Sequence, residues 1–181
     1  MRKMLTLAAV TMSLVAGAAR AEVTDQSPAG FEVTEKVGIL APRAKVWAAL
    51  MTPAAWWNSQ HSWSGDARNL TLDLANGCFC EKLAGGFVRH MTLTYVDQGA
   101  QLRMFGGLGP LQFTGAAGHM GIALKDSPGG TDLTLTYDVG GYAKGGLAEH
   151  WAAPVDTVLA EQVARLKRYV ETGRPDASAA P

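Results

Sequence analysis

Residues 146–172 have the sequence GLAEHWAAPVDTVLAEQVARLKRYVET, which predicts one long C-terminal helix. Apolar residues recur there at steps of three and four, so they share one face of a 3.6-residue helix. They are Leu147, Trp151, Val155, Val158, Leu159, Val163, Leu166, Tyr169 and Val170. At about 1.5 Å per residue the helix spans roughly 40 Å. A one-sided helix of that length needs an equally long apolar surface, which we expect the upstream chain to supply.

The boundaries of this helix are marked by glycine and proline. Gly173 and Pro175 follow its last turn, as is typical of helix ends. Pro154 conflicts with a straight helix, because it removes a hydrogen bond and clashes with the preceding turn. Either the helix kinks at Pro154, which we favour, or a segment at 146–152 leads into a second helix with Pro154 at its first position.

The region between residues 31 and 141 is dominated by the period-two alternation of antiparallel strands. Strands are expected at 31–40, 70–74, 78–83, 87–97, 101–106, 111–125 and 131–141. Glycine-rich turns such as Asn76–Gly77 join them. Two short helical segments, 43–51 and 52–57, follow the first strand, and a loop spans 58–69. This order predicts an α+β fold, in which a curved antiparallel sheet of about six or seven strands wraps around the long C-terminal helix.

The first 21 residues have the pattern of a secretory signal peptide. Arg2 and Lys3 precede an apolar stretch, and Ala19-Arg20-Ala21 is a typical cleavage site. The stretch is shorter than the roughly 20 residues of a membrane span, so we expect no transmembrane anchor in the mature form. One domain is expected at 22–174, and a disordered tail at 175–181. The protein is therefore predicted to be secreted, and periplasmic if it is bacterial.

Charge argues against two classes of partner. The chain has 16 basic and 16 acidic residues, and three of the basic ones lie in the predicted signal peptide. This leaves 13 basic residues against 16 acidic ones in the mature chain, a formal charge of −3. Nucleic-acid surfaces are clearly basic, and anionic lipid attracts basic patches. We therefore expect no nucleic-acid partner. The oligomeric state is left open.

Residues 41–50, APRAKVWAAL, followed by Ala55-Trp56-Trp57, resemble the opening of the START-like (SRPBCC) superfamily. This superfamily includes polyketide cyclases/dehydratases, Hsp90-activator-like domains and pollen-allergen-like proteins. The resemblance implies the helix-grip fold, with a cavity between sheet and long helix that holds a small, mostly apolar molecule. The predicted secretion departs from many relatives, which are cytoplasmic, and argues against a cytoplasmic chaperone-partner role.

Aromatic residues are the main candidates for binding such a molecule. Trp56, Trp57 and Trp63 crowd the region where the resemblance places the cavity mouth, and they can stack on an aromatic or lipidic ligand. The alternative is that they pack in the core and at its rim. The full set of predicted ligand-binding residues is Trp56, Trp57, His61, Trp63, Tyr137 and Trp151.

Three polar residues are candidates for catalysis: His61, Glu81 and Tyr137. Glu81 shares a strand face with Phe79, so it is expected inside, where it needs a partner or a raised pKa. A Glu–His or Tyr–His pair in a closed pocket can do general acid–base work such as cyclisation or dehydration. The alternative is that each is a satisfied polar group of the core.

Cys78-Phe79-Cys80 allows three interpretations. Residues i and i+2 of a strand lie about 6.5–7 Å apart, which is long for a disulfide. The two thiols are therefore reduced and buried, or bridged through a distorted backbone next to Gly77, or redox-active or metal-bound. His61, His90, His119 and His150 lie in different predicted elements without a metal-binding spacing. We expect no metal and no cofactor.

The leading functional hypothesis is a periplasmic carrier or sensor that binds a small hydrophobic molecule in the sheet–helix cavity. It is preferred because of the tryptophan-rich region at the expected cavity mouth, the one-sided C-terminal helix and the lack of a G-x-S-x-G, Walker or G-x-G-x-x-G motif. The first alternative is an enzyme of the polyketide cyclase/dehydratase type that uses acid–base residues in the same cavity. The second is a partner-binding module, which an exposed apolar patch on the outer sheet face would favour.

Overall fold

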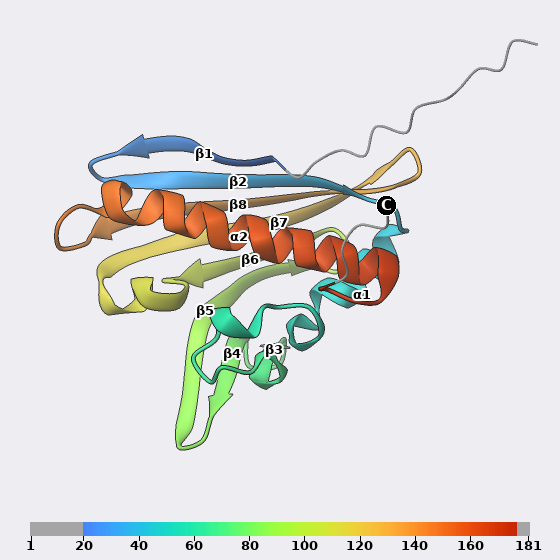
Figure 1. The fold of residues 1–181 in the computed structure, drawn as a ribbon, viewed down its shortest axis with the longest axis horizontal. Helices are drawn as coiled ribbons and strands as arrows, with labels where there is room; N and C mark the ends of the chain where they lie inside the picture. The colour runs from blue at the N-terminus through green and yellow to red at the C-terminus, as the bar shows by residue number, and fades with distance from the viewer. Residues whose placement is uncertain (1–19, 177–181) are drawn as a thin grey trace, which may run out of the picture.

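The structure, a computed structural model, describes residues 20–176, which form one curved antiparallel sheet with a long helix along its inner face (Figure 1). The sheet has eight strands in the order β1-β2-β8-β7-β6-β5-β4-β3. Their bounds are β1 Arg20–Ser27, β2 Gly30–Ile39, β3 Leu70–Asp73, β4 Cys78–Leu83, β5 Gly86–Asp97, β6 Gln101–Gly106, β7 Gly115–Ser127 and β8 Gly130–Tyr142. The predicted α+β, helix-grip architecture is confirmed, with more strands than the predicted six or seven.

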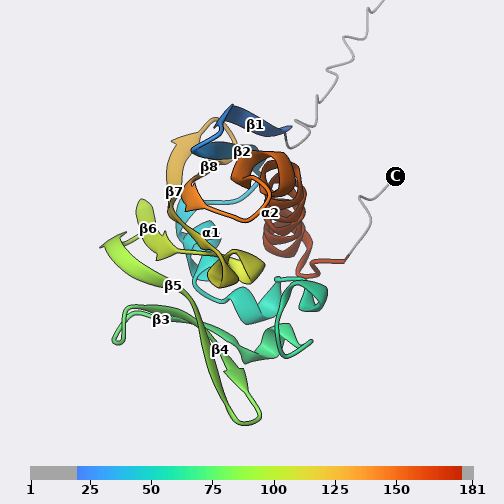
Figure 2. The same ribbon diagram turned by 90° about the vertical axis from the view of Figure 1, so that its left-hand side faces the viewer.

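The helix α2 (Leu147–Thr172) lies across β1 and β2, on the concave side of the curved sheet (Figure 2). Its predicted stripe forms the contact, because Leu159, Val163, Leu166 and Val170 are all buried. Gly173 ends it in the left-handed conformation, with a φ of 78°. The helix is continuous through Pro154, so the alternative of two separate helices is wrong.

Shorter helices connect the strands. They are α1 (Arg43–Leu50) and the 3₁₀ turns η1 (Pro53–Ala55), η2 (Ser59–His61), η3 (Ala67–Asn69) and η4 (Gly109–Phe113). Helix α1 buries Val46, Trp47 and Leu50, as its spacing predicts. The second predicted helical segment is only the single turn η1.

Two elements differ from the sequence prediction. Strand β1 was missed because it is mostly polar, with the sequence RAEVTDQS, and only part of it alternates. The strand expected from residue 111 begins only at Gly115, since η4 occupies Gly109–Phe113. Pro110 favours a helical turn there, and the turn buries Leu111 instead of aligning it with the sheet.

The two ends of the chain need separate comment. The predicted signal peptide lies outside the described residues, apart from Arg20 and Ala21 at the start of β1. Of the predicted tail, Pro175 and Asp176 are described, and both contact α2. Arg168 Nε donates to the Pro175 carbonyl at 2.7 Å, and Arg165 pairs with the Asp176 carboxylate. No helix within residues 20–176 is long and apolar enough to span a membrane.

Candidate functional site

A cavity of about 300 Å³ lies between α2 and the β3–β5 end of the sheet. Helix α2 contributes Trp151, Pro154, Val155, Val158 and Leu159 to its wall. The chain from Trp57 to Trp63 and the segment Leu108 to Leu111 close two further sides. Leu70 of β3, Phe79 of β4 and His90 of β5 supply the sheet side. The lining is therefore mostly apolar, with a few polar side chains.

Three of the four tryptophans predicted to bind a ligand line this cavity. They are Trp57, Trp63 and Trp151. Trp56 does not line it. Its indole is buried, with Nε1 donating to the Ala49 carbonyl at 2.8 Å, and it borders a separate apolar void of about 40 Å³. Ligand contact by the other three stays a prediction.

Two aromatic side chains from different loops meet beside the cavity. The ring centroids of Trp63 and Phe113 are 5.3 Å apart in an edge-on arrangement. Trp63 is 42% exposed and Phe113, on η4, is 79% exposed. Because Trp63 also lines the cavity, this contact joins the two segments at the side of the cavity that faces solvent.

His61 lies on the cavity wall but is half-exposed and paired with α2. Its Nε2 lies 3.0 Å from Glu161 Oε2, and its carbonyl accepts a 2.9 Å hydrogen bond from Trp57 Nε1. Asn58 reinforces the same junction through a 2.5 Å bond to Glu161 Oε1. His61 is therefore held to the helix rather than to another catalytic candidate.

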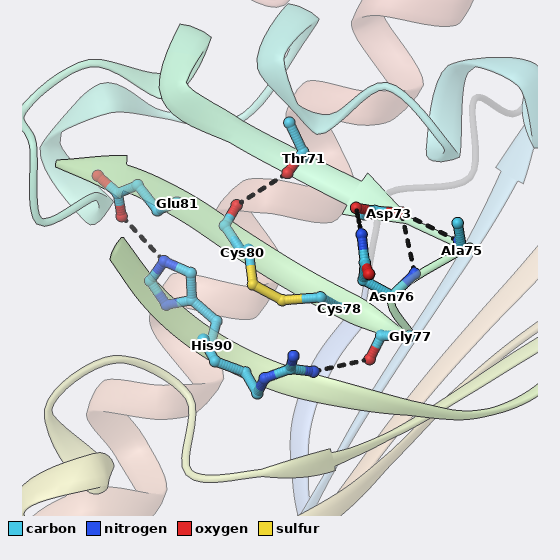
Figure 3. Close-up of a disulfide and its surroundings, with 10 residues drawn as sticks. Thr71, Asp73, Ala75, Asn76, Gly77, Cys78, Cys80, Glu81 and His90 are labelled. Atoms are coloured by element: carbon cyan, nitrogen blue, oxygen red, sulfur yellow. Dashed lines mark hydrogen bonds and ion pairs between the residues drawn. A yellow bond between two sulfur atoms is a disulfide. The ribbon is translucent and has the colours of Figure 1, made fainter. Parts of the chain in front are cut away.

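Glu81 is fully buried and accepts three hydrogen bonds (Figure 3 shows its pairing with His90). The backbone N–H groups of Trp63 and Ser64 donate at 3.0 and 2.5 Å, and His90 Nε2 lies 2.9 Å from Oε2. Burial opposes ionisation, but these hydrogen bonds outweigh it and hold the pKa of Glu81 below its ordinary value. Glu81 is thus a carboxylate that fixes the Trp63 loop and orients His90.

His90 is 4% exposed and lies on the cavity wall, 5.2 Å from the ring of Phe79 between centroids. Burial lowers the pKa of His90, and the bond to Glu81 opposes this only in part. At neutral pH the imidazole is therefore neutral. Because the Glu81 carboxylate can only accept, Nε2 carries the proton. The other nitrogen, Nδ1, has no hydrogen-bond partner among the described residues.

A β-bulge explains why His90 faces inward. In the β4–β5 ladder Phe79 pairs with Met91 but Cys80 pairs with Arg89, so His90 is an extra residue without a partner. The bulge buries both His90 and Met91, although neighbours in a regular strand alternate. His90 was not among the predicted site residues, because the sequence shows no metal-binding spacing around it. The available signal was a break in the alternation of apolar residues in β5, because Val88 and Met91 are three positions apart rather than an even number.

Tyr137 does not belong to the cavity. It lies on β8, and its hydroxyl donates to the Gly106 carbonyl at 2.8 Å and accepts from the Leu108 N–H at 3.0 Å. Burial raises the pKa of Tyr137 to about 12. The structure therefore pairs Glu81 with His90, and brings neither His61 nor Tyr137 into hydrogen-bond contact with Glu81.

Cys78 and Cys80 form a disulfide (Figure 3). Their Cα atoms are 5.4 Å apart, closer than in a regular strand, so the structure takes the distorted-backbone alternative. Among residues 20–176, no group of three or more His, Cys, Asp and Glu side chains is arranged to hold a metal ion.

Comparison with known proteins gives structural matches only. No model of a protein family and no curated protein matches the chain. An uncharacterised protein from Rhizobium leguminosarum is 19% identical over 84% of this chain and 97% of its own, with a TM-score of 0.56. CalU16 from Micromonospora echinospora is 16% identical over 90% and 88%, with a TM-score of 0.53. Aha1 from Colwellia psychrerythraea, solved as a dimer, is 17% identical over 78% and 97%, with a TM-score of 0.52.

These similarities concern the fold. The chain has the helix-grip architecture, as the resemblance to START-like proteins implied. Identities this low carry no information about ligand or reaction, because one fold hosts many functions.

Proposed function

We propose that this protein binds a small, mostly apolar molecule in the cavity beneath α2, and that it acts as a periplasmic carrier or sensor. The observation that carries the proposal is the cavity itself. Its volume of about 300 Å³ is at the lower end of the range for small-molecule sites, which is about 300–1,000 Å³. Its wall offers three tryptophan side chains, which suit a flat or aliphatic ligand.

The periplasmic location rests on the signal-peptide pattern of residues 1–21. Cleavage after Ala21 removes two residues of β1 and leaves its remaining part, from Glu22 onward, paired with β2. The mature chain then keeps every residue that lines the cavity.

Native mass spectrometry of the protein purified from its own cells tests for a retained ligand, and the same spectrum reports the oligomeric state. A fluorescence titration with N-phenylnaphthylamine, a small apolar aromatic probe, then tests the cavity directly. The variant Val155→Trp fills the cavity from α2 and is expected to weaken probe binding by about tenfold or more. The control, Ala153→Trp, adds the same side chain at an exposed position of the same helix. Equal binding by both variants would contradict the proposal.

Acid–base catalysis is a second candidate, favoured by the Glu81–His90 pair. A neutral imidazole oriented by a buried carboxylate is the arrangement of a general base, with Glu81 as the positioning residue. In this reading the polyketide cyclase-like enzyme of the first alternative uses His90 in place of His61 and Tyr137. Deuterium exchange at the carbon beside the carbonyl of an aryl ketone tests it. Loss of enhanced exchange in His90→Phe, with probe binding retained, supports catalysis. If the wild-type protein does not accelerate deuterium exchange, catalysis of this substrate is excluded.

The partner-binding alternative has one observation in its favour. Phe87, Tyr95 and Phe105 are exposed on β5 and β6. Two of them already pack against neighbours on the sheet, since Arg103 lies over the Tyr95 ring and the Phe105 ring lies tilted against His119, 4.9 Å between centroids. The cavity therefore remains the better supported site.

A further inference from the structure

The Cys78–Cys80 disulfide lies on the sheet face opposite the cavity, directly behind one of the cavity's wall residues. Phe79, between the two cysteines, projects to the inner side, where it lines the cavity. Its ring centroid is 5.2 Å from that of His90 and 5.6 Å from that of Trp57. A change in the β4 backbone at this point must therefore move the cavity wall.

The disulfide shortens β4 where β5 has an extra residue. The Cα atoms of Cys78 and Cys80 are 5.4 Å apart, whereas an extended strand places such residues about 6.5–7 Å apart. Cys78 pairs with Thr92 and Cys80 with Arg89, so three residues of β4 face four of β5. Because the disulfide shortens this segment of β4, the facing segment of β5 is longer than its partner. The bulge at His90 accommodates the extra residue.

This bulge decides the orientation of His90. In an unbroken ladder that keeps the Phe79–Met91 pair, His90 would oppose Cys80, and paired residues point to the same face. His90 would then lie on the outer face with the disulfide. The bulge instead turns its imidazole inward to Glu81, at 2.9 Å. The orientation of the His90 side chain in the cavity wall thus depends on the conformation of the backbone around the disulfide.

Stabilisation of the whole fold is a poor explanation for this disulfide. A bridge restricts the unfolded chain less when the loop it closes is shorter, and here the cysteines are only two positions apart. Access for a reductant is asymmetric. Cys78 is buried, whereas Cys80 is half-buried and opposite the exposed Arg89. An attacking thiolate therefore reaches the Cys80 sulfur more readily.

We propose that the Cys78–Cys80 disulfide is a redox control of the cavity, and this rests on the proposed ligand-binding function. The oxidised form holds Phe79 and His90 in the ligand-binding arrangement, and reduction by a dithiol lowers affinity. The dithiol's thiolate attacks Cys80 Sγ and forms a mixed disulfide, while Cys78 leaves as a thiolate and takes up a proton. The second dithiol sulfur then displaces Cys80. Two electrons and two protons pass to the protein, and the dithiol becomes a disulfide.

The test is a titration of oxidised and dithiothreitol-reduced wild-type protein with N-phenylnaphthylamine. We expect the reduced form to bind about fivefold more weakly or worse, at the lower end of typical coupling between sites. The double variant Cys78→Ser/Cys80→Ser is the matched control. It lacks both thiols, so its affinity is expected to match that of the reduced protein and not to respond to dithiothreitol.

Each other outcome has a defined meaning. Equal affinity of the two wild-type forms, with reduction confirmed by a mass gain of two hydrogens, overturns the redox control and leaves the binding function intact. No probe binding in either form contradicts the proposed function itself. Amide NMR spectra show whether reduction changes only β4, β5 and their neighbours. If the amide chemical shifts lose their dispersion throughout the reduced protein, reduction unfolds the whole chain and the proposed local mechanism is overturned. This measurement uses wild-type protein, so it remains decisive even if the double variant fails to fold.

Discussion

Glu81 Oε2 and His90 Nε2 lie 2.9 Å apart on neighbouring strands, in a contact that exists because β5 bulges at His90. The same carboxylate accepts hydrogen bonds from the backbone of Trp63 and Ser64. One buried charge therefore links the sheet, the cavity wall and the loop that carries Trp63.

Replacing Glu81 with glutamine is expected to destabilise the fold by about 2–4 kcal/mol, because a buried charged acceptor is removed and its donors lose their best partner. Urea unfolding measures the change. Glu149→Gln alters an exposed carboxylate in the first turn of α2 and is expected to cost less than about 1 kcal/mol. Equal costs for the two variants would contradict the role assigned to Glu81.

The burial of Glu35 predicts that the free energy of unfolding depends on pH. It is buried between β2 and α2, neither of its carboxylate oxygens has a hydrogen-bond partner among the described residues, and burial followed by the neighbouring Asp156 raises its pKa to about 8. Between the ordinary pKa of 4.5 and about 8, the folded form holds a proton that the unfolded chain has lost. The contribution of Glu35 to the free energy of unfolding therefore falls as pH rises through this window.

The variant Glu35→Gln removes this titration. Denaturation at a series of pH values measures it as the difference in the free energy of unfolding between wild type and variant, which cancels the titrating groups that do not contact Glu35 and leaves Glu35 with its neighbour Asp156. We expect the free energy of unfolding of the variant, relative to that of wild type, to increase continuously from pH 5 to pH 8, as the unfolded wild-type chain loses a proton that the folded form keeps. A difference that stays flat with pH would show that Glu35 titrates normally.

Tyr137→Phe tests whether this residue supports the cavity wall rather than catalysis. The hydroxyl bonds both Gly106 and Leu108, so its loss is expected to cost about 1–3 kcal/mol and to loosen the segment leading to η4. Probe binding should weaken without disappearing. Tyr142→Phe, at an exposed position, is the control and should change neither quantity. Unchanged stability of Tyr137→Phe would argue against the structural role.

The contact between Trp63 and Phe113 is expected to slow ligand release. An edge-on aromatic pair contributes about 0.5–1.5 kcal/mol, so Phe113→Ala should speed probe dissociation about two- to tenfold. Stopped-flow fluorescence measures this rate. Phe87→Ala removes another highly exposed phenylalanine, near the β4–β5 turn, which does not line the cavity, and serves as the control. Identical rates for both variants would mean that Trp63 and Phe113 do not gate the cavity.

Part of the site could be predicted from sequence. The resemblance to START-like proteins placed the cavity mouth where Trp56, Trp57 and Trp63 crowd together, and Trp57 and Trp63 line the cavity whereas Trp56 does not. The inward position of Glu81 followed from its sharing a face with Phe79. Its partner could not be predicted, because a bulge shifts which β5 residues face inward, and no local propensity fixes that shift.

By itself, the sequence determined the elements whose signals are local. The periodicity of 147–172 required an apolar surface along one face of the helix, the alternation of the strands supplied it, and Gly173 set the helix end. Only the tertiary structure decided which polar groups meet. Glu81 with His90, Glu35 with Asp156 and Tyr137 with Leu108 depend on strand register and on how α2 and the loops lie over the sheet. Those depend on contacts between residues distant in sequence, which local patterns do not record.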